Sequence, residues 1–74
     1  MSGARRLSNR LRVLRAEADL TQEELAKSVE VSRQTIVAIE GGDYEPSVAL
    51  ALALAERFSK PVEQVFALEP GKKH

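Results

Sequence analysis

The sequence predicts an all-α fold, a bundle of five short helices in a single small domain. The chain has 74 residues, which is near the lower limit at which a domain folds without disulfides or metals. Apolar residues recur at helical spacing in successive segments, and Thr21, Ser32 and Ser47 each precede such a segment where a hydroxyl caps a helix N-terminus. Because the chain contains no cysteine, neither a disulfide framework nor a thiolate metal site is available.

A first helix is expected near the start of the chain. Ser8 or Asn9 can cap it, and its apolar pattern continues to about Ala18. Asp19 tolerates the left-handed backbone conformation that ends a helix. Leu20 is then expected to pack back onto this helix.

Residues 21–40 predict two helices joined by a tight turn. Thr21 can cap the first of them, and Glu24 can reach back to the N–H of Thr21, so that the two residues form a capping box. The chain turns near Glu30, and Ser32 can cap the second helix.

Side chains that form hydrogen bonds follow in the first turn of this second helix, at Arg33, Gln34 and Thr35. A helix that lies in the DNA major groove presents residues to base edges at this position. Arginine can bond to O6 and N7 of guanine, and glutamine to N6 and N7 of adenine; each such pair gives about 1–3 kcal/mol of discrimination. The alternative is an ordinary solvated helix face, and the capped helix that precedes these residues favours DNA binding.

Two more helices are expected after a turn-rich connector at residues 41–46. Ser47 can cap a fourth helix that extends to about Phe58. Its alternation of Ala and Leu would also fit a strand, but both residues favour helices over strands. A short fifth helix is expected over residues 62–66, and residues 67–69 can be extended.

The expected organisation is an N-terminal arm over residues 1–8, one domain over residues 9–68 and a tail over residues 69–74. No repeat or second domain is visible. No apolar run approaches the roughly 20 residues that a membrane span needs, and no hydrophobic signal region follows the N-terminal arginines. We therefore expect a cytoplasmic protein with no membrane partner.

Charge is polarised along the chain although the formal net charge is zero. Residues 1–16 hold five arginines and no acid, whereas residues 17–45 hold eight acids against Lys27 and Arg33. Long-range attraction to DNA should therefore be modest. The arginine-rich start is either a solvated arm or a contact to flanking phosphates or the minor groove.

The apolar residues fall into two groups. The first is assigned to the core: Leu20, Leu25, Val29, Val31, Ile36, Ile39 and Leu54. The second either completes the core or pairs two subunits: Leu52, Val65, Phe66 and Leu68. Because so small a bundle cannot bury all of its apolar surface, we expect the second group to provide a dimer interface.

An enzyme is not expected. Carboxylates and serines occur, but neither cysteine nor a Gly-rich phosphate loop accompanies them, and the single histidine, His74, is the last residue. No cofactor, metal site or small-molecule effector domain is predicted.

Four segments together resemble a known family: LTQEELA, VSRQTIVAIE, YEPS and PVEQVF. They resemble the Cro/cI-repressor-like, or Xre-type, helix-turn-helix DNA-binding domains over residues 9–66. The combined pattern looks like the compact single-domain bacterial or phage regulators that bind DNA as homodimers. The resemblance implies a five-helix lambda-repressor-like bundle, in some relatives with a short β-strand pairing of the flanking residues.

The implied function is a sequence-specific transcriptional regulator that binds double-stranded DNA at a palindromic operator. Repression is the expected sign, because a lone domain can occlude a promoter without further surfaces; activation is the alternative, since controller proteins of this architecture can also activate. An antitoxin-like protein-binding module with secondary DNA autoregulation is the alternative.

The resemblance also assigns roles to residues. It implies a structural salt bridge between Arg15 and Glu40 that ties the first helix to the third. Base contacts are expected from four residues, the last of which can touch only a thymine methyl: Arg33, Gln34, Thr35 and Ala38. DNA-backbone contacts are expected from five: Gln22, Ser32, Gly42 through its N–H, Tyr44 and Ser47.

Three acidic residues depart from the pattern of many relatives. Glu30 stands where many have glycine in the turn, and a left-handed conformation there costs on the order of 1–2 kcal/mol. Asp43 and Glu45 place negative charge beside the expected backbone contacts.

Overall fold

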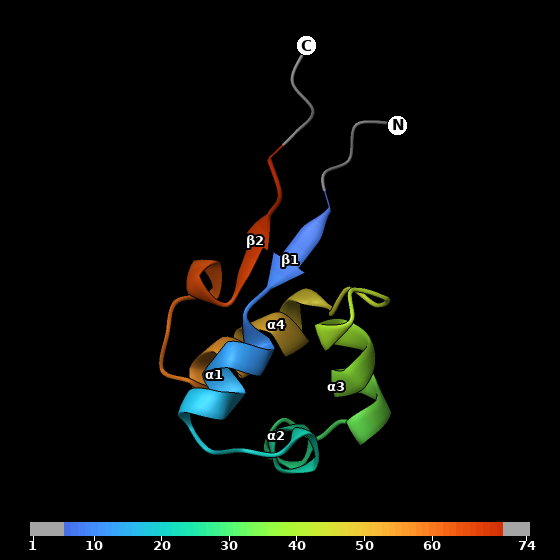
Figure 1. Cartoon of the computed structure of the whole chain (residues 1–74), viewed down its shortest axis with the longest axis vertical. Coiled ribbons are helices and arrows are strands. Elements are labelled where there is room, and N and C mark those ends of the chain that lie inside the picture. The colour runs from blue at the N-terminus through green and yellow to red at the C-terminus, as the bar shows by residue number, and fades with distance from the viewer. Residues whose placement is uncertain (1–5, 71–74) are drawn as a thin grey trace.

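The computed structural model describes residues 6–70 and contains, within them, four α-helices, one 3-10 helix and a two-stranded antiparallel sheet (Figure 1). The strands project from one end of the helical body, and α2 lies at the opposite end (Figure 1). Every helix in this part of the chain is too short or too polar to cross a lipid bilayer. In chain order the elements are β1 (Leu7–Asn9), α1 (Leu11–Glu17), α2 (Gln22–Ser28), α3 (Arg33–Glu40), α4 (Val48–Arg57), η1 (Val62–Gln64, the 3-10 helix) and β2 (Phe66–Leu68).

Hydroxyl caps start three of the four α-helices, as predicted. The Thr21 Oγ1 accepts the N–H of Glu24 at 3.0 Å, and the N–H of Thr21 donates to Glu24 Oε1 at 2.9 Å, which completes the capping box. Ser32 and Ser47 each accept the N–H of the residue three positions on, at 3.2 and 3.1 Å. These local interactions fix where α2, α3 and α4 begin.

Helix α1 begins at Leu11, so the N-cap position belongs to Arg10 rather than to Ser8 or Asn9. The Asn9 side chain nevertheless accepts the N–H of Leu11 at 3.1 Å. Its amide nitrogen donates to the carbonyl oxygen of Ile39 at 2.9 Å. Asn9 therefore joins the start of α1 to the C-terminal turn of α3.

The prediction of a fifth α-helix over residues 62–66 is wrong. The chain forms the single 3-10 turn of η1 and then enters β2, which pairs with β1 in the register Leu7↔Leu68 and Asn9↔Phe66. The backbone groups of this segment find partners in the other strand, which a helix of five residues could not have supplied so fully. The mainly helical class and the short strand pairing are both present.

Strand β1 takes up two residues that were assigned to the N-terminal arm, Leu7 and Ser8. The Ser8 hydroxyl donates to the carbonyl of Ala67 across the sheet at 3.1 Å. Residues 6, 69 and 70 of the expected arm and tail are described outside the strands, and residues 1–5 and 71–74 lie outside the described residues.

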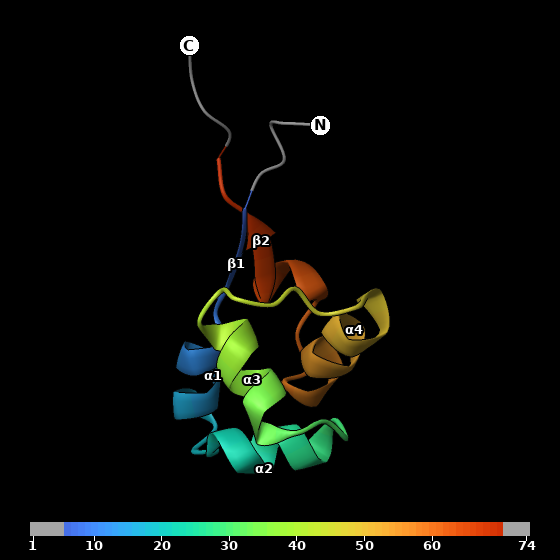
Figure 2. The ribbon, with the colours of Figure 1, turned by 90° about the vertical axis from the view of Figure 1, so that its right-hand side faces the viewer.

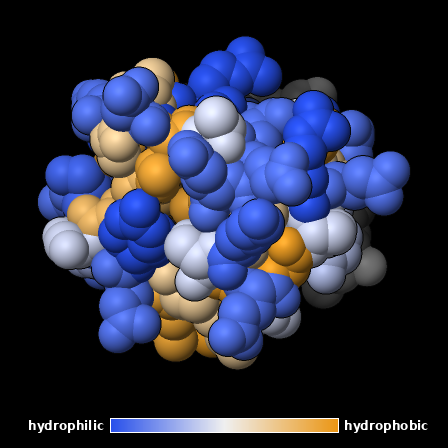
Figure 3. All heavy atoms as spheres, turned by 90° about the horizontal axis from the view of Figure 1, so that it is seen from below, coloured by the Kyte–Doolittle hydropathy of each residue, from blue (hydrophilic) through white to orange (hydrophobic). Residues whose placement is uncertain are grey.

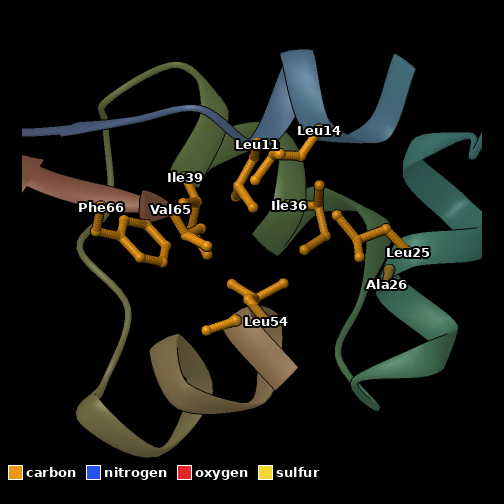
Figure 4. Packing of buried hydrophobic residues seen from close by; sticks show 10 residues of the cluster. Leu11, Leu14, Leu25, Ala26, Ile36, Ile39, Leu54, Val65 and Phe66 are labelled. Atoms are coloured by element: carbon orange, nitrogen blue, oxygen red, sulfur yellow. The ribbon is translucent and has the colours of Figure 1, made fainter. Parts of the chain in front are cut away.

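The hydrophobic core lies between the helices and the base of the sheet (Figure 4). Of the residues assigned to it, four are buried, and Leu20, Val29 and Val31 pack against it partly buried. Val65 and Phe66 complete the core, whereas Leu52 and Leu68 are each 54% exposed. The buried set is Leu11, Leu14, Leu25, Ala26, Ile36, Ile39, Leu54, Ala55, Val65 and Phe66.

Three helices end at a non-glycine residue in the left-handed conformation. Asp19 follows α1 with φ 59°, Glu30 follows α2 with φ 63°, and Ser59 follows α4 with φ 55°. The structure thus confirms the left-handed conformation at Asp19 and Glu30. After α3 the same role falls to Gly42, with φ 81°.

Candidate nucleic-acid interface

The turn between α2 and α3 fixes the angle at which α3 leaves the body. The N–H of Val31 donates to the carbonyl of Ala26 at 3.0 Å, so the turn folds back onto the end of α2. Ile36 and Ile39 then anchor one face of α3 in the core. The opposite face of α3 is directed outward, toward the viewer in Figure 2.

The first turn of α3 presents its polar residues to solvent. Arg33 and Gln34 are exposed and Thr35 is half-buried. The Ser32 and Thr35 hydroxyl oxygens lie 3.0 Å apart, so these two side chains bond to each other. Arg33 and Gln34 are therefore the residues of this turn whose long side chains extend from a fixed backbone.

An open hollow of about 290 Å³ brings most of the predicted contact residues together. Its lining consists of Ser32, Gln34, Thr35 and Ala38 from the start and outer side of α3, with Tyr44 from the connection to α4. Three of the four residues predicted to contact bases thus share one concave surface with two residues predicted to contact the DNA backbone.

A buried ion pair holds α3 against the rest of the bundle, as predicted. The Arg15 Nε lies 2.7 Å from Glu40 Oε2, and its Nη2 donates to Glu40 Oε1 at 3.2 Å. A third bond runs from Arg15 Nη1 to the Leu20 carbonyl at 3.0 Å. The Glu40 side chain is only 2% exposed and that of Arg15 17%. The pair therefore joins the C-terminal turn of α3 to α1, and through Leu20 to the loop between α1 and α2.

The ionised form of Glu40 is favoured at this position. Burial by itself raises the pKa of Glu40, but hydrogen bonds from Arg15 and Gln22 and the positive charges of Arg15 and Arg12 outweigh it, so the pKa is lowered from its ordinary value of 4.5. The carboxylate consequently stays charged and paired under neutral conditions.

Several predicted backbone contacts have partners within the protein. The Gln22 Nε2 donates to Glu40 Oε1 at 3.1 Å, so this side chain belongs to the ion-pair cluster. The N–H of Gly42 donates to the Ile39 carbonyl at 3.0 Å and is not free for a phosphate. Ser47 caps α4 with its hydroxyl. Tyr44 is half exposed and stays available.

The role of Asn9 in positioning α3 was not anticipated from the sequence. An Asn before a helix suggests a cap, and its partner Ile39 lies 30 residues further on. Nothing local to Asn9 could have revealed that contact.

The end of the molecule formed by α2 is mostly hydrophilic, with hydrophobic atoms visible only between polar side chains (Figure 3). The large exposed apolar residues include Val48 and Leu52, one turn apart on α4 at 76% and 54% exposed, and Leu68 at the end of β2. Val13 on α1 and Val37 on α3 are also exposed. Val48 and Leu52 thus give α4 an exposed apolar face.

Comparison with known proteins agrees with this geometry. The family model described as Helix-turn-helix matches residues 11–65. An uncharacterized HTH-type transcriptional regulator of Methanocaldococcus jannaschii is 49% identical over 63 residues, which are 85% of this chain and 96% of that protein. The cryptic phage CTXphi transcriptional repressor RstR of Vibrio cholerae is 34% identical over 58 residues, 78% of this chain and 52% of RstR. Among solved structures, the restriction-modification controller protein C.AhdI of Aeromonas hydrophila superposes with a TM-score of 0.68 at 30% identity, covering 73% of this chain and 78% of that one.

Proposed function

Because this chain belongs to the Xre-type helix-turn-helix family of transcriptional regulators, we propose that it binds double-stranded DNA sequence-specifically, as a homodimer that represses transcription at a palindromic operator. The observation that carries the proposal is the first turn of α3. Ser32 fixes its start, and the exposed Arg33 and Gln34 extend beside the hollow that ends at Tyr44.

Helix α3 would lie in the major groove with its N-terminal turn toward the bases. Arg33 suits a guanine and Gln34 an adenine, because each can bond to two atoms of that base edge. Thr35 and Ala38 offer smaller groups, the Ala38 methyl being able to touch a thymine methyl. Tyr44 would contact the backbone at the edge of the same hollow.

A homodimer follows from the small number of base contacts that one α3 can make. Two half-sites about 34 Å apart, one helical turn of DNA, would double the recognition sequence. The exposed Leu52 and Leu68 support an apolar interface. Val65 and Phe66, which were grouped with them, are buried in the core and are left out of this proposal. The name of RstR, a transcriptional repressor, supports repression, and that of C.AhdI, a controller protein, supports a regulatory role.

The proposal is tested by selecting bound duplexes from random DNA with the wild type and with Arg33→Ala/Gln34→Ala. The wild type should select two symmetric half-sites. The double variant should keep its thermal midpoint and lose preference at the positions that these residues contact, by about 1–3 kcal/mol for each bidentate pair.

The matched control is Arg57→Ala/Gln64→Ala, which removes the same two residue types from exposed positions on α4 and η1. It should select the same sequences as the wild type. Unchanged selection by the α3 double variant would show that base recognition has been assigned to the wrong residues. Sedimentation of Leu52→Asp tests the dimer separately, since a charge at a subunit interface should shift the protein to monomer.

A further inference from the structure

Arg6 is held at a defined place beside the α3–α4 connection. Its carbonyl oxygen accepts the N–H of Glu69 at 2.8 Å, one step beyond the last paired residues of the sheet. Three residues later, Asn9 bonds to the carbonyl of Ile39 in α3. The segment that carries Arg6 is therefore fixed at both ends, against β2 and against the C-terminal turn of α3.

The guanidinium of Arg6 lies over Gly42. Its Nη2 is 3.9 Å from the point that a Cβ on Gly42 would occupy. It lines a small hollow of about 60 Å³ together with Gly42, Tyr44 and Glu45. Among residues 6–70 the Arg6 side chain has no acidic partner, since the ion pair present in that range is the one between Arg15 and Glu40. An exposed cation thus stands unpaired at the edge of the connection.

Tyr44 belongs to both hollows. It closes the hollow of α3 that Gln34 and Ala38 line, and it also lines the hollow that contains Arg6. The hollow on the outer face of α3 and the hollow beside Arg6 thus have Tyr44 as a common neighbour. Figure 2 shows this side of the molecule, where the connection from α3 to α4 passes across the base of the strands.

We propose that Arg6 contacts a backbone phosphate of the DNA that flanks each half-site, an inference that rests on the proposed function. The DNA backbone that borders the major groove beside α3 would pass Tyr44 and then reach Arg6. The planar guanidinium is suited to two phosphate oxygens at once. Residues 41–47 contain two acids and no base, so the phosphate-binding charge at this edge would come from Arg6, immediately before β1, and not from the connection itself.

The test compares Arg6→Ala with Arg10→Ala in salt titrations, using the duplex selected by the wild type and an unrelated duplex of equal length. Arg10 is the matched control, because it is an exposed arginine of the same segment that lines a different hollow, beside Glu63. Each phosphate contact contributes about 0.9 to the slope of log affinity against log salt, so a dimer that loses two should fall by about 1.8. The affinity difference between wild type and Arg6→Ala should then shrink about 12-fold from 50 to 200 mM salt.

Arg6→Ala should weaken binding to both duplexes by the same factor, because a phosphate contact carries no sequence information. Arg6→Lys should keep most of the slope, and the thermal midpoint of both variants should match that of the wild type. Arg10→Ala should leave the slope unchanged.

A Glu45→Gln background excludes a purely internal role. If Arg6 served only to neutralise Glu45, then Arg6→Ala would have no effect on affinity once Glu45 is uncharged, and that result would overturn the inference. Persistence of the effect supports it. A wild type that binds DNA while Arg6→Ala keeps the full slope overturns the Arg6 contact alone, whereas a wild type that selects no sequence from random DNA overturns the proposed function as well.

Discussion

Replacing Arg15 with alanine removes the cation that a nearly buried carboxylate depends on. Glu40 is 2% exposed and receives two bonds from Arg15, at 2.7 and 3.2 Å, and one from Gln22 at 3.1 Å. Removing one partner of a fully buried pair costs about 3–5 kcal/mol, because the remaining charge is left uncompensated. The Arg15 side chain is 17% exposed, so water can reach part of the vacated space. The lower end, about 3 kcal/mol, is therefore expected.

Thermal and urea unfolding at neutral pH, followed by circular dichroism, measure this cost. In a domain of this size a loss of about 3 kcal/mol lowers the thermal midpoint by about 12–24 °C. Arg12→Ala is the control, since Arg12 is an exposed arginine on the same helix that acts on Glu40 through its charge alone, without the hydrogen bonds that Arg15 makes; its removal should stay within about 0.5 kcal/mol of the wild type.

A second substitution separates the unpaired charge from other effects. Adding Glu40→Gln to Arg15→Ala removes the uncompensated carboxylate and should recover part of the lost stability, because a neutral amide costs less to bury. Equal unfolding free energies for Arg15→Ala and Arg12→Ala, or no recovery in the double variant, would refute this account of the cluster.

Three further predictions concern stability. The pKa of Glu40 is lowered from 4.5 in the folded state. Its ion pair therefore stabilises the fold above pH 4.5, and that contribution is lost as the pH falls through the folded-state pKa. In acid unfolding followed against pH, Glu40→Gln should not show this loss of stability. Glu30→Gly should raise the unfolding free energy by roughly 0.5–1 kcal/mol, because φ is 63° and glycine adopts it without the Cβ penalty, whereas Glu30→Ala should give no gain. Leu54→Ala should lose about 2–5 kcal/mol from a fully buried site; Leu52→Ala, half exposed on the same helix, should lose far less in the monomer, and equal losses would contradict the assignment of the core.

What the sequence could predict is set by interactions over three or four residues. Thr21 with Glu24, and the hydroxyls of Ser32 and Ser47, located three helix starts within the structure because each cap acts on its own first turn. The spacing of Ile36 and Ile39 likewise identified the buried side of α3, and hence its outward side with Arg33.

Contacts between distant residues could not be predicted in this way. Strand β2 exists because residues 66–68 pair with a segment about 60 positions earlier. An extended conformation was expected for residues 67–69, and the family resemblance implied a strand pairing, but nothing within that stretch identifies its register or excludes a helical turn at Phe66. The same holds for Gln22, for which the family resemblance implied a phosphate contact, whereas its bond to Glu40, 18 residues further on, could not be read from the sequence. The ion pair itself was anticipated only through the family resemblance.

The register of the sheet also has a kinetic consequence. Leu7 opposite Leu68 closes a loop that contains nearly all of the described chain, whereas the caps and the α2–α3 turn close over a few residues. Because closing a longer loop costs more entropy, the helices should assemble first and the strands should pair after the rate-limiting step. Substitutions in the sheet should then speed unfolding and leave the folding rate nearly unchanged. The two short strands would determine how long the folded domain, and with it the anchored position of α3, persists once formed.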